Sequence, residues 1–406
     1  MTEAGAPRWL SIVGIGEDGV EGLSAAARGL IANAELIVGG ERHLKRAEDL
    51  IRGERLAWPK PFAKGIDLVL AAKGRQVVVL ASGDPFDHGV GVSLAERVPM
   101  SEVVCLPAAS AVSLASARLG WARAQTTTVS LCGRPLALLA PCLQPGRRLF
   151  VLCADAATPA KVAAYLTERG FGRSRLHLLE ALGGDEEQVS SHEAASFDAA
   201  SHPLTLLGLE IVAEPEARVI ALAPGLDDAL FEHDGQITKR EIRALTLSAL
   251  APRAGECLWD IGCGSGAVSI EWMLRHAANI AIGLELDTVR AARARRNAAA
   301  LGTPGLRVIE AKAPAGLSEL PAPNAVFVGG GARDPALIGA TWRALAPGGR
   351  LVANAVTLET ETALYAARET YGGSLTRLSV ERLDKVGRLH AFRPAMSVVQ
   401  WAATKP

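Results

Sequence analysis

A glycine-rich turn between two short apolar stretches carries the residue types best suited to chemistry in this chain. The stretch Cys257 to Trp259 predicts a strand that leads into Asp260, glycines follow at positions 262, 264 and 266, and a helix-like run comes next. A second apolar stretch, IAIGLELD, predicts a strand that ends at Glu285. Glycines at a strand-to-helix turn let the backbone approach a ligand closely, and an acid about twenty residues later can accept hydrogen bonds from both hydroxyls of a ribose. This order predicts a βαβ unit that binds an adenosine-containing ligand.

The same turn is open to two interpretations, because Gly262, Gly264 and Ala267 also satisfy the loose G-x-G-x-x-G/A pattern of dinucleotide-binding proteins. Two features favour S-adenosylmethionine over a dinucleotide such as NAD. Asp260 stands directly before the turn, where it would repel a pyrophosphate, and PGGRLVANAV (347–356) reads as a turn that feeds a late strand. S-adenosylmethionine carries no phosphate and presents an amino group that an acid can hold. The residues therefore favour a methyltransferase, with an NAD-dependent oxidoreductase and a purely structural glycine turn as alternatives.

Length and composition limit the class of protein. The length of 406 residues favours two or three domains. Hydrophobic residues make up 49% of the chain and the formal net charge is zero, which indicates a globular protein without the basic surface of a nucleic-acid binder. The N-terminal sequence MTEAGAPR lacks the basic region and the apolar run of a signal peptide, and no stretch of about 20 apolar residues could span a membrane. We expect a cytoplasmic protein with no nucleic-acid or membrane partner.

Thiols and imidazoles show no metal-binding or redox pattern. The six cysteines include no C-x-x-C pair, so we expect buried apolar thiols rather than disulfides or a metal site. The eight histidines include no H-E-x-x-H, and no metal centre is predicted. Cys263 lies inside the glycine turn, but we do not expect it to act as a nucleophile.

Strand-like and helix-like segments alternate along the first 212 residues, which predicts an α/β fold. Ser24 is a candidate N-cap of the first helix. From residue 213 to 235 the pattern lapses into proline, glycine and acidic residues, which we interpret as a linker. Thr238 and Glu241 then match a capping box that opens a helix, and residues 236–406 read as one doubly wound domain. The strands expected in the first domain (1–212) are 9–13, 76–85, 103–110, 147–155, 175–184 and 203–212.

The first domain resembles the tetrapyrrole methylase family, through GIGEDG (14–19), VLASGDPFDHGVG (79–91), PAAS (107–110) and LCGRP (131–135). The resemblance implies two α/β lobes with S-adenosylmethionine in the cleft between them. Where the family has a more apolar segment, this chain has Phe86-Asp87-His88, so His88 is a candidate for substrate binding. The residues implied in cofactor binding are Gly14, Gly16, Ser82, Gly83, Asp84, Ala109, Ser110 and Arg134.

The second domain resembles the C15-methylating, decarboxylating subunits of the cobalamin pathway. The motifs are ITKREIRALTLSAL (237–250), LWDIGCGSG (258–266), VFVGGGA (326–332) and LVANAVTLET (351–360). The residues implied in holding a second S-adenosylmethionine are Thr238, Gly262, Cys263, Gly264, Ser265, Gly266, Glu285 and Ala313. Lys312 stands where the family has an aspartate that contacts adenine, and lysine cannot accept that hydrogen bond.

The two domains in this order resemble a family of fused precorrin methyltransferases. The resemblance implies C5 methylation by the first domain, C15 methylation with decarboxylation of the ring C acetate by the second, two S-adenosylmethionine sites, a tetrapyrrole substrate and a homo-oligomer. The substrate supplies enamine-like carbons as nucleophiles, so the absence of a Ser-His-Asp motif is no objection. A protein that senses S-adenosylmethionine without turnover is the remaining alternative. Arginines that could hold the substrate carboxylates as forks are Arg333, Arg382 and Arg388, together with Arg377 and Arg393.

Overall fold

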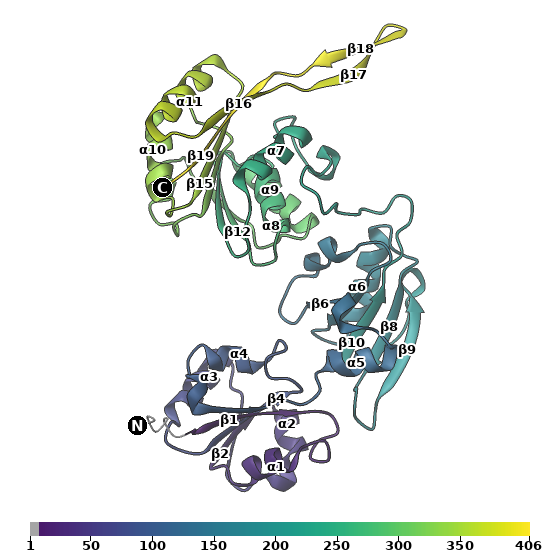
Figure 1. Cartoon of the computed structure of the whole chain (residues 1–406). Helices are drawn as coiled ribbons and strands as arrows, with labels where there is room; N and C mark the ends of the chain where they lie inside the picture. Colours follow the sequence, from purple (N-terminus) through teal and green to yellow (C-terminus); the bar gives the residue numbers. More distant parts are fainter. Residues whose placement is uncertain (1–7) are drawn as a thin grey trace. The chain divides into compact units, whose positions relative to one another are not determined.

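The computed structural model describes residues 8–406, which form two compact units (Figure 1). The first unit runs to Arg134 and resumes over Gln144–Arg218, and the second comprises Pro135–Leu143 and Val219–Pro406. The prediction about a signal peptide concerns the start of the chain, and residues 1–7 lie outside the described part. None of the helices in residues 8–406 combines the length and the apolar character needed to cross a membrane.

The first lobe of unit one is built on a five-stranded parallel sheet with the order β3-β2-β4-β1-β5. Side chains of its central strands are buried on both faces, as in VVVLA of β4, because helices cover the sheet. The strands are β1 (Leu10–Ile15), β2 (Leu36–Gly39), β3 (Glu54–Ala57), β4 (Val77–Ser82) and β5 (Val103–Leu106). The helices are α1 (Ala25–Ala32), α2 (Glu41–Arg46), α3 (Phe62–Ala71) and α4 (Val90–Ala95).

The second lobe of unit one is a mixed sheet with the order β6-β7-β10-β8-β9. Only the β6–β7 pair is parallel, and the other three pairs are antiparallel. Its strands are β6 (Thr126–Ser130), β7 (Arg148–Leu152), β8 (Arg175–Glu180), β9 (Gln188–Glu193) and β10 (Thr205–Glu210). Its helices are α5 (Ala111–Leu119) and α6 (Thr158–Glu168).

Unit two is a seven-stranded sheet with the order β13-β12-β11-β14-β15-β19-β16. The first five strands in this order are parallel, and β19 and β16 add antiparallel pairs at one edge. Helices α7, α8 and α9 lie on one face and α10 and α11 on the other (Figure 1). The strands are β11 (Cys257–Ile261), β12 (Ile280–Glu285), β13 (Arg307–Glu310), β14 (Ala325–Val328), β15 (Arg350–Ala355), β16 (Ser374–Leu378) and β19 (Val398–Thr404). The helices are α7 (Arg240–Leu250), α8 (Ala267–Leu274), α9 (Thr288–Ala300), α10 (Pro335–Ala344) and α11 (Leu358–Tyr371).

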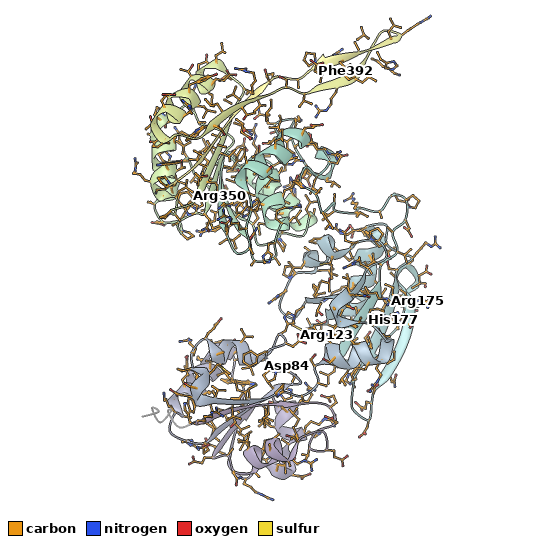
Figure 2. The ribbon with its side chains drawn as sticks, viewed as in Figure 1. Asp84, Arg123, Arg175, His177, Arg350 and Phe392 are labelled. Atoms are coloured by element: carbon orange, nitrogen blue, oxygen red, sulfur yellow. The ribbon has the colours of Figure 1, made fainter. Side chains whose placement is uncertain are left out.

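A separate hairpin extends away from the seven-stranded sheet of unit two. It consists of β17 (Glu381–Val386) and β18 (Leu389–Pro394), and every residue of both strands is exposed. Figure 2 shows Phe392 on this hairpin, outside the body of the unit. The hairpin therefore presents both backbone edges and apolar side chains to its surroundings.

The expected fold class is confirmed: both halves are α/β, the first with two lobes and the second doubly wound. Ser24 caps α1 as predicted, since its side chain accepts a hydrogen bond from the N–H of Ala27. The capping box at Thr238 is wrong, because Lys239 is the N-cap of α7 and no side chain caps that helix. In unit one, strands β2, β3, β6 and β9 were not predicted. Strands β3 and β9 are largely exposed, β6 is only partly buried, and β2 has only four residues.

The segment interpreted as a linker, residues 213–235, is packed along much of its length. The N–H groups of Glu214 and Arg218 donate to the carbonyls of Gly170 and Arg169, at 2.9 and 3.0 Å, within unit one. From Val219 onward the chain belongs to unit two, where Leu226 and Phe231 are buried. The contacts divide the units between residues 218 and 219, and the domain limits of 1–212 and 236–406 stay a prediction.

Candidate cofactor and substrate sites

The glycine turn of unit two connects β11 to α8 at the centre of the sheet. It lies where the strand order reverses, between β11 with its neighbour β12 on one side and β14 on the other. Ligands of doubly wound proteins bind at this switch point. Gly262, Gly264 and Gly266 all have positive φ, at 72, 55 and 77°. A Cβ on Gly262 would lie 3.2 Å from the N of Gly330, so the turns after β11 and β14 approach closely.

Glu285, at the end of β12, is fixed by two backbone amides of unit two. Its Oε2 accepts a hydrogen bond from the N–H of Gly264 at 2.9 Å, and its Oε1 accepts one from Asp287 at 3.0 Å. The carboxylate is therefore held directly beside the glycine turn. Each oxygen keeps lone-pair capacity for a further donor, which is what binding of ribose hydroxyls requires.

Asp260 is buried at the end of β11, with 1% of its surface exposed. Its Oδ2 accepts hydrogen bonds from the N–H and the hydroxyl of Ser269, at 3.1 and 2.6 Å. Its Oδ1 is buried without a hydrogen-bond partner in residues 8–406. Burial raises the pKa of this carboxyl to about 6, against the lowering effect of Ser269. An unsatisfied buried acceptor at this turn fits a ligand that brings a donor group.

The amides of the turn are already used inside the protein. The N–H groups of Gly262 and Cys263 donate to the carbonyl of Leu284, at 2.9 and 3.1 Å, and that of Gly266 donates to Cys263 at 2.8 Å. The N–H of Gly264 donates to Glu285. A pyrophosphate site needs such amides directed at the ligand. The turn therefore favours a ligand without phosphate.

Cys263 packs inside the turn rather than reacting there. Its Sγ lies 2.7 Å from where a Cβ on Gly283 would stand, so only glycine fits at that position of β12. Burial, followed by the carboxylates of Asp260 and Glu285, raises the pKa of this thiol well above its ordinary value. A protonated, buried thiol is a poor nucleophile. The six cysteines are all free, but only Cys257 and Cys263 are buried, so the prediction of buried thiols is wrong for exposed Cys132 in the turn after β6.

The other residues predicted for this site are spread over unit two. The carbonyl of Thr238 accepts a hydrogen bond from the buried guanidinium of Arg243. Ala313 packs against the hydrophobic core, and the neighbouring Lys312 is exposed. Arg333 is exposed in the loop that follows β14 and its glycines.

The arginines near the C-terminus have acidic partners or lie on the hairpin. Arg382 pairs with Glu241 at the start of α7, and Arg377 pairs with Glu361 of α11 at 2.8 Å. Arg393 pairs with Asp384 across the hairpin at 3.3 Å. Arg388 lies at the exposed hairpin turn between β17 and β18. The hairpin candidates are thus separated in sequence and in sheet from the glycine turn.

Unit one contains a cavity of about 460 Å³ lined by residues of both its sheets. The loops after β1, β4 and β5 meet at its edge, and a Cβ on Gly14 would overlap the carbonyl O of Gly83. Predicted residues that line the cavity are Gly16, Ser82, Gly83, His88, Ala109 and Ser110. Gly14, Asp84 and Arg134 are not among the lining residues.

Two of the residues outside the lining have other visible roles. Gly14 permits the close approach of the β1 and β4 loops, as its crowded Cβ position indicates. Asp84, labelled in Figure 2, accepts a hydrogen bond from the N–H of Phe86 at 2.8 Å and so shapes the turn after β4. Arg134 is exposed after β6.

The cavity also contains side chains that the sequence analysis missed, on α2. His43 Nε2 lies 2.9 Å from Ser82 Oγ, and Arg42 donates to the same hydroxyl at 3.3 Å. Burial, followed by the charge of Arg42, lowers the pKa of His43 to about 4, so its imidazole is neutral near pH 7. Glu17 holds Arg42 and Arg46 as ion partners. The segment GERH directly after LIVG (36–39) was the available signal, but β2 was not recognised as a strand.

Known protein families and relatives match both halves of this chain. A family model described as precorrin methyltransferase domain matches residues 229–405, and one described as tetrapyrrole (corrin/porphyrin) methylases matches residues 10–198. A precorrin-6Y C(5,15)-methyltransferase (decarboxylating) from Sinorhizobium sp is 52% identical over 98% of this chain and 96% of its own length. The enzyme of the same name from Mycobacterium tuberculosis (strain CDC 1551 / Oshkosh) is 39% identical over 97% of this chain and 99% of its own.

A shorter relative covers one half. A probable cobalt-precorrin-6B C(15)-methyltransferase (decarboxylating) from Pyrobaculum calidifontis is 35% identical over 44% of this chain and 96% of its own length. The resemblance inferred from the motifs is confirmed by the matches over the full length. This chain belongs to the family of precorrin-6Y C5,15-methyltransferases (decarboxylating).

Proposed function

We propose that this chain is a bifunctional methyltransferase of cobalamin (corrin) biosynthesis. It methylates C5 and C15 of a precorrin-6 type tetrapyrrole and decarboxylates the ring C acetate to give precorrin-8. The observation that carries this proposal is the similarity to relatives of that name over 98% and 97% of the chain, which includes both halves. The relative named for C15 methylation and decarboxylation matches only 44% of the chain, which supports a division of the two reactions between the halves.

Membership of a methyltransferase family implies S-adenosylmethionine as the methyl donor. We assign one cofactor site to each unit, the glycine turn in unit two and the cavity in unit one. S-adenosylmethionine supplies an electrophilic methyl group bound to a sulfonium, and the sulfur leaves as a neutral thioether when the methyl is transferred. In unit two, Glu285 would hold the ribose hydroxyls, the unsatisfied Oδ1 of Asp260 would accept from a donor group, and Ala313 would lie against the adenine.

In unit one, the residues that would hold the second cofactor are the lining members of the predicted set, Gly16, Ser82, Gly83, Ala109 and Ser110. Trp58 and Phe62, whose ring centroids are 4.9 Å apart, also line this cavity and give it an apolar face for a flat macrocycle. His88 stands at the same cavity as a substrate candidate.

The protein's task in both reactions is alignment. A reduced tetrapyrrole supplies a carbon nucleophile conjugated to ring nitrogens. Holding the reactants in line can therefore lower the activation barrier by up to roughly 7 to 11 kcal/mol. Decarboxylation can use the conjugated macrocycle as electron sink once the reacting acetate is desolvated. Arg333, in the loop beside the glycine turn, and the hairpin residues Arg382 and Arg388 are the candidates for holding the other carboxylates.

Specific contacts disfavour the alternative functions. The internal use of four amides in the glycine turn opposes the binding of a pyrophosphate, and with it an NAD-dependent oxidoreductase. A protein that only senses S-adenosylmethionine at the glycine turn has no need of the further cavity of about 460 Å³ in unit one.

The projecting hairpin supports a homo-oligomer. A two-stranded ribbon is at best marginally stable by itself. Leu383, Val386, Leu389 and Phe392 are between 54% and 75% exposed on it. Pairing with the hairpin of a second copy would cover these side chains and the open strand edges.

Mass spectrometry of the product tests the division of the reactions. Gly264→Asp forces a side chain and a charge onto a residue with positive φ at the second site, while Ala109→Trp fills the first cavity from an exposed position. With a precorrin-6 type substrate, Ala109→Trp should give a product with one added methyl and one carboxyl lost. Gly264→Asp should leave the acetate intact. Loss of carbon dioxide that persists in Gly264→Asp would overturn the assignment.

A further inference from the structure

Asn297, on α9, joins the glycine turn to the chain segment that enters unit two. Only 2% of its surface is exposed. Its Nδ2 donates to the carbonyls of Ser265 and Glu232, at 2.9 and 3.0 Å, and its Oδ1 accepts from the N–H of Glu232 at 2.8 Å. Both N–H donors of the amide are therefore used. Because the backbone N–H of Glu232 needs an acceptor, the Oδ1 atom of Asn297 must face it, and this fixes the orientation of the Asn297 side-chain amide.

The segment in question, Gly225–Thr238, is clamped by a buried ion pair as well. Glu271 and Arg243 are fully buried, with Oε1 and Nε 2.5 Å apart. Glu271 accepts hydrogen bonds from the first two N–H groups of the segment, at 2.7 and 2.9 Å. Arg243 donates to the carbonyls of Leu226 and Thr238. These contacts fix both ends of the segment to α7 and α8.

Surface ion pairs hold its middle against α9. Asp234 pairs with Arg290 and Arg293, at 2.9 and 3.1 Å, and the hydrogen bond from Arg293 is the main cause of its lowered pKa. The carbonyl of Gln236 lies 3.8 Å from where a Cβ on Gly264 would stand. The arginine-rich run 292–297 thus includes Arg293, which helps to hold this segment beside the glycine turn.

We propose that Asn297 is a positioning residue of the second cofactor site, which holds the segment Gly225–Thr238 and the glycine turn in one arrangement. The inference rests on the proposed function, in which that turn binds S-adenosylmethionine. Asn297 touches both parts through one amide, and its two hydrogen bonds with the backbone of Glu232 fix the orientation in which Nδ2 donates to the Ser265 carbonyl. Binding linkage is reciprocal: an ordered segment raises cofactor affinity, and bound cofactor protects the segment by the same factor.

Hydrogen exchange on the wild-type full-length chain tests the linkage without any substitution. S-adenosylhomocysteine at saturation should slow exchange of the amides in Gly225–Thr238, including that of Glu232, by about fivefold or more. The segment Gln188–Glu193, an edge strand of unit one, serves as the internal reference. Unchanged exchange in Gly225–Thr238 at saturation would overturn the inference.

Asn297→Asp keeps the size of the side chain and the acceptor for Glu232 but sets a carboxylate oxygen against two carbonyls. We expect cofactor affinity at one of the two sites to fall about tenfold, with loss of the protection of the segment. Arg296→Gln, which breaks only the surface pair with the Glu232 side chain, and Asn33→Asp, the same chemical change at an exposed position, should keep wild-type affinity.

Three outcomes are decisive. Wild-type affinity in folded Asn297→Asp refutes the positioning role. If this variant does not fold, the exchange result on the wild type decides. If Gly264→Asp binds as many cofactor molecules as the wild type, the cofactor site itself is refuted, and this inference with it. If Asn297→Asp loses the protection of Gly225–Thr238 but still binds two cofactor molecules, the result supports the positioning role of Asn297 and leaves the cofactor site in place.

Discussion

Replacement of Glu285 by alanine is the sharpest test of the second cofactor site. The carboxylate of Glu285 is fixed by the N–H groups of Gly264 and Asp287, at 2.9 and 3.0 Å, and is 8% exposed. A hydrogen bond to a charged group contributes about 1.5 to 3 kcal/mol, so loss of one ribose contact should weaken cofactor binding roughly 10- to 150-fold. Because the N–H of Gly264 also loses its partner, the variant should unfold at a lower urea concentration even without ligand.

Calorimetry with S-adenosylhomocysteine separates the two effects. We expect the wild-type chain to bind close to two molecules and Glu285→Ala to retain one at wild-type affinity. Glu310→Ala is the matched control, since Glu310 is the register partner of Glu285 on β13 but is exposed and pairs with Arg295. Two sites of unchanged affinity in Glu285→Ala would show that this carboxylate does not hold the ribose. A wild-type stoichiometry of one would refute the second site in the chain.

Three further predictions concern stability and assembly. The fragment 219–406 should fold and bind cofactor, whereas the fragment 236–406 should unfold at a lower urea concentration. The shorter fragment lacks buried Leu226 and Phe231 and the two backbone N–H groups that donate to Glu271. Equal urea midpoints for the two fragments would contradict this. Phe392→Glu on the hairpin should shift the sedimentation of the protein toward that of a monomer. Tyr365→Glu on α11, at another exposed position outside the hairpin, should leave sedimentation unchanged. A monomeric wild type would exclude the hairpin interface. Burial raises the pKa of Asp260 from its ordinary value of 3.8 to about 6 in the folded chain, so the folded state binds the extra proton. The free energy of unfolding should therefore fall as pH rises from about 4 to 6, by on the order of 3 kcal/mol. Urea titrations of Asp260→Asn should lack this pH dependence, and parallel curves for the variant and the wild type would refute it.

Local sequence was sufficient for the parts of the sites that depend on strand ends and turns. Strand β12 ends at Glu285 as the apolar run predicted, and the three glycines after β11 have the positive φ that a tight strand-to-helix turn requires. Asp260 was recognised, but as a charge facing the ligand. Its hydrogen bonds to Ser269 and its raised pKa come from burial under α8, which no local pattern encodes.

The residues that sequence reasoning missed act through distant partners. His43 reaches Ser82 across 39 positions, and Asn297 reaches Ser265 and Glu232 across 32 and 65. In the sequence, Asn297 closes an arginine-rich helix that reads as a solvated face. Its amide is functional only because α9 packs beneath the turn, so a pattern of charge and periodicity could not distinguish it from its exposed neighbours.

The backbone shapes the two candidate cofactor sites in different ways. In unit one, glycines at positions 14 and 83 let three loops approach each other around the cavity. In unit two, a single turn satisfies its own amides with Leu284, Cys263 and Glu285. No group of His, Cys, Asp or Glu that could hold a metal ion is found within residues 8–406. Alkylation of a substrate carbon by a sulfonium needs neither a metal ion nor a nucleophilic side chain of the protein. Since alignment is the main demand, we expect the most sensitive positions to be those that hold the turns, Asn297, Arg243 and Glu271 among them, rather than reactive side chains at the ligand.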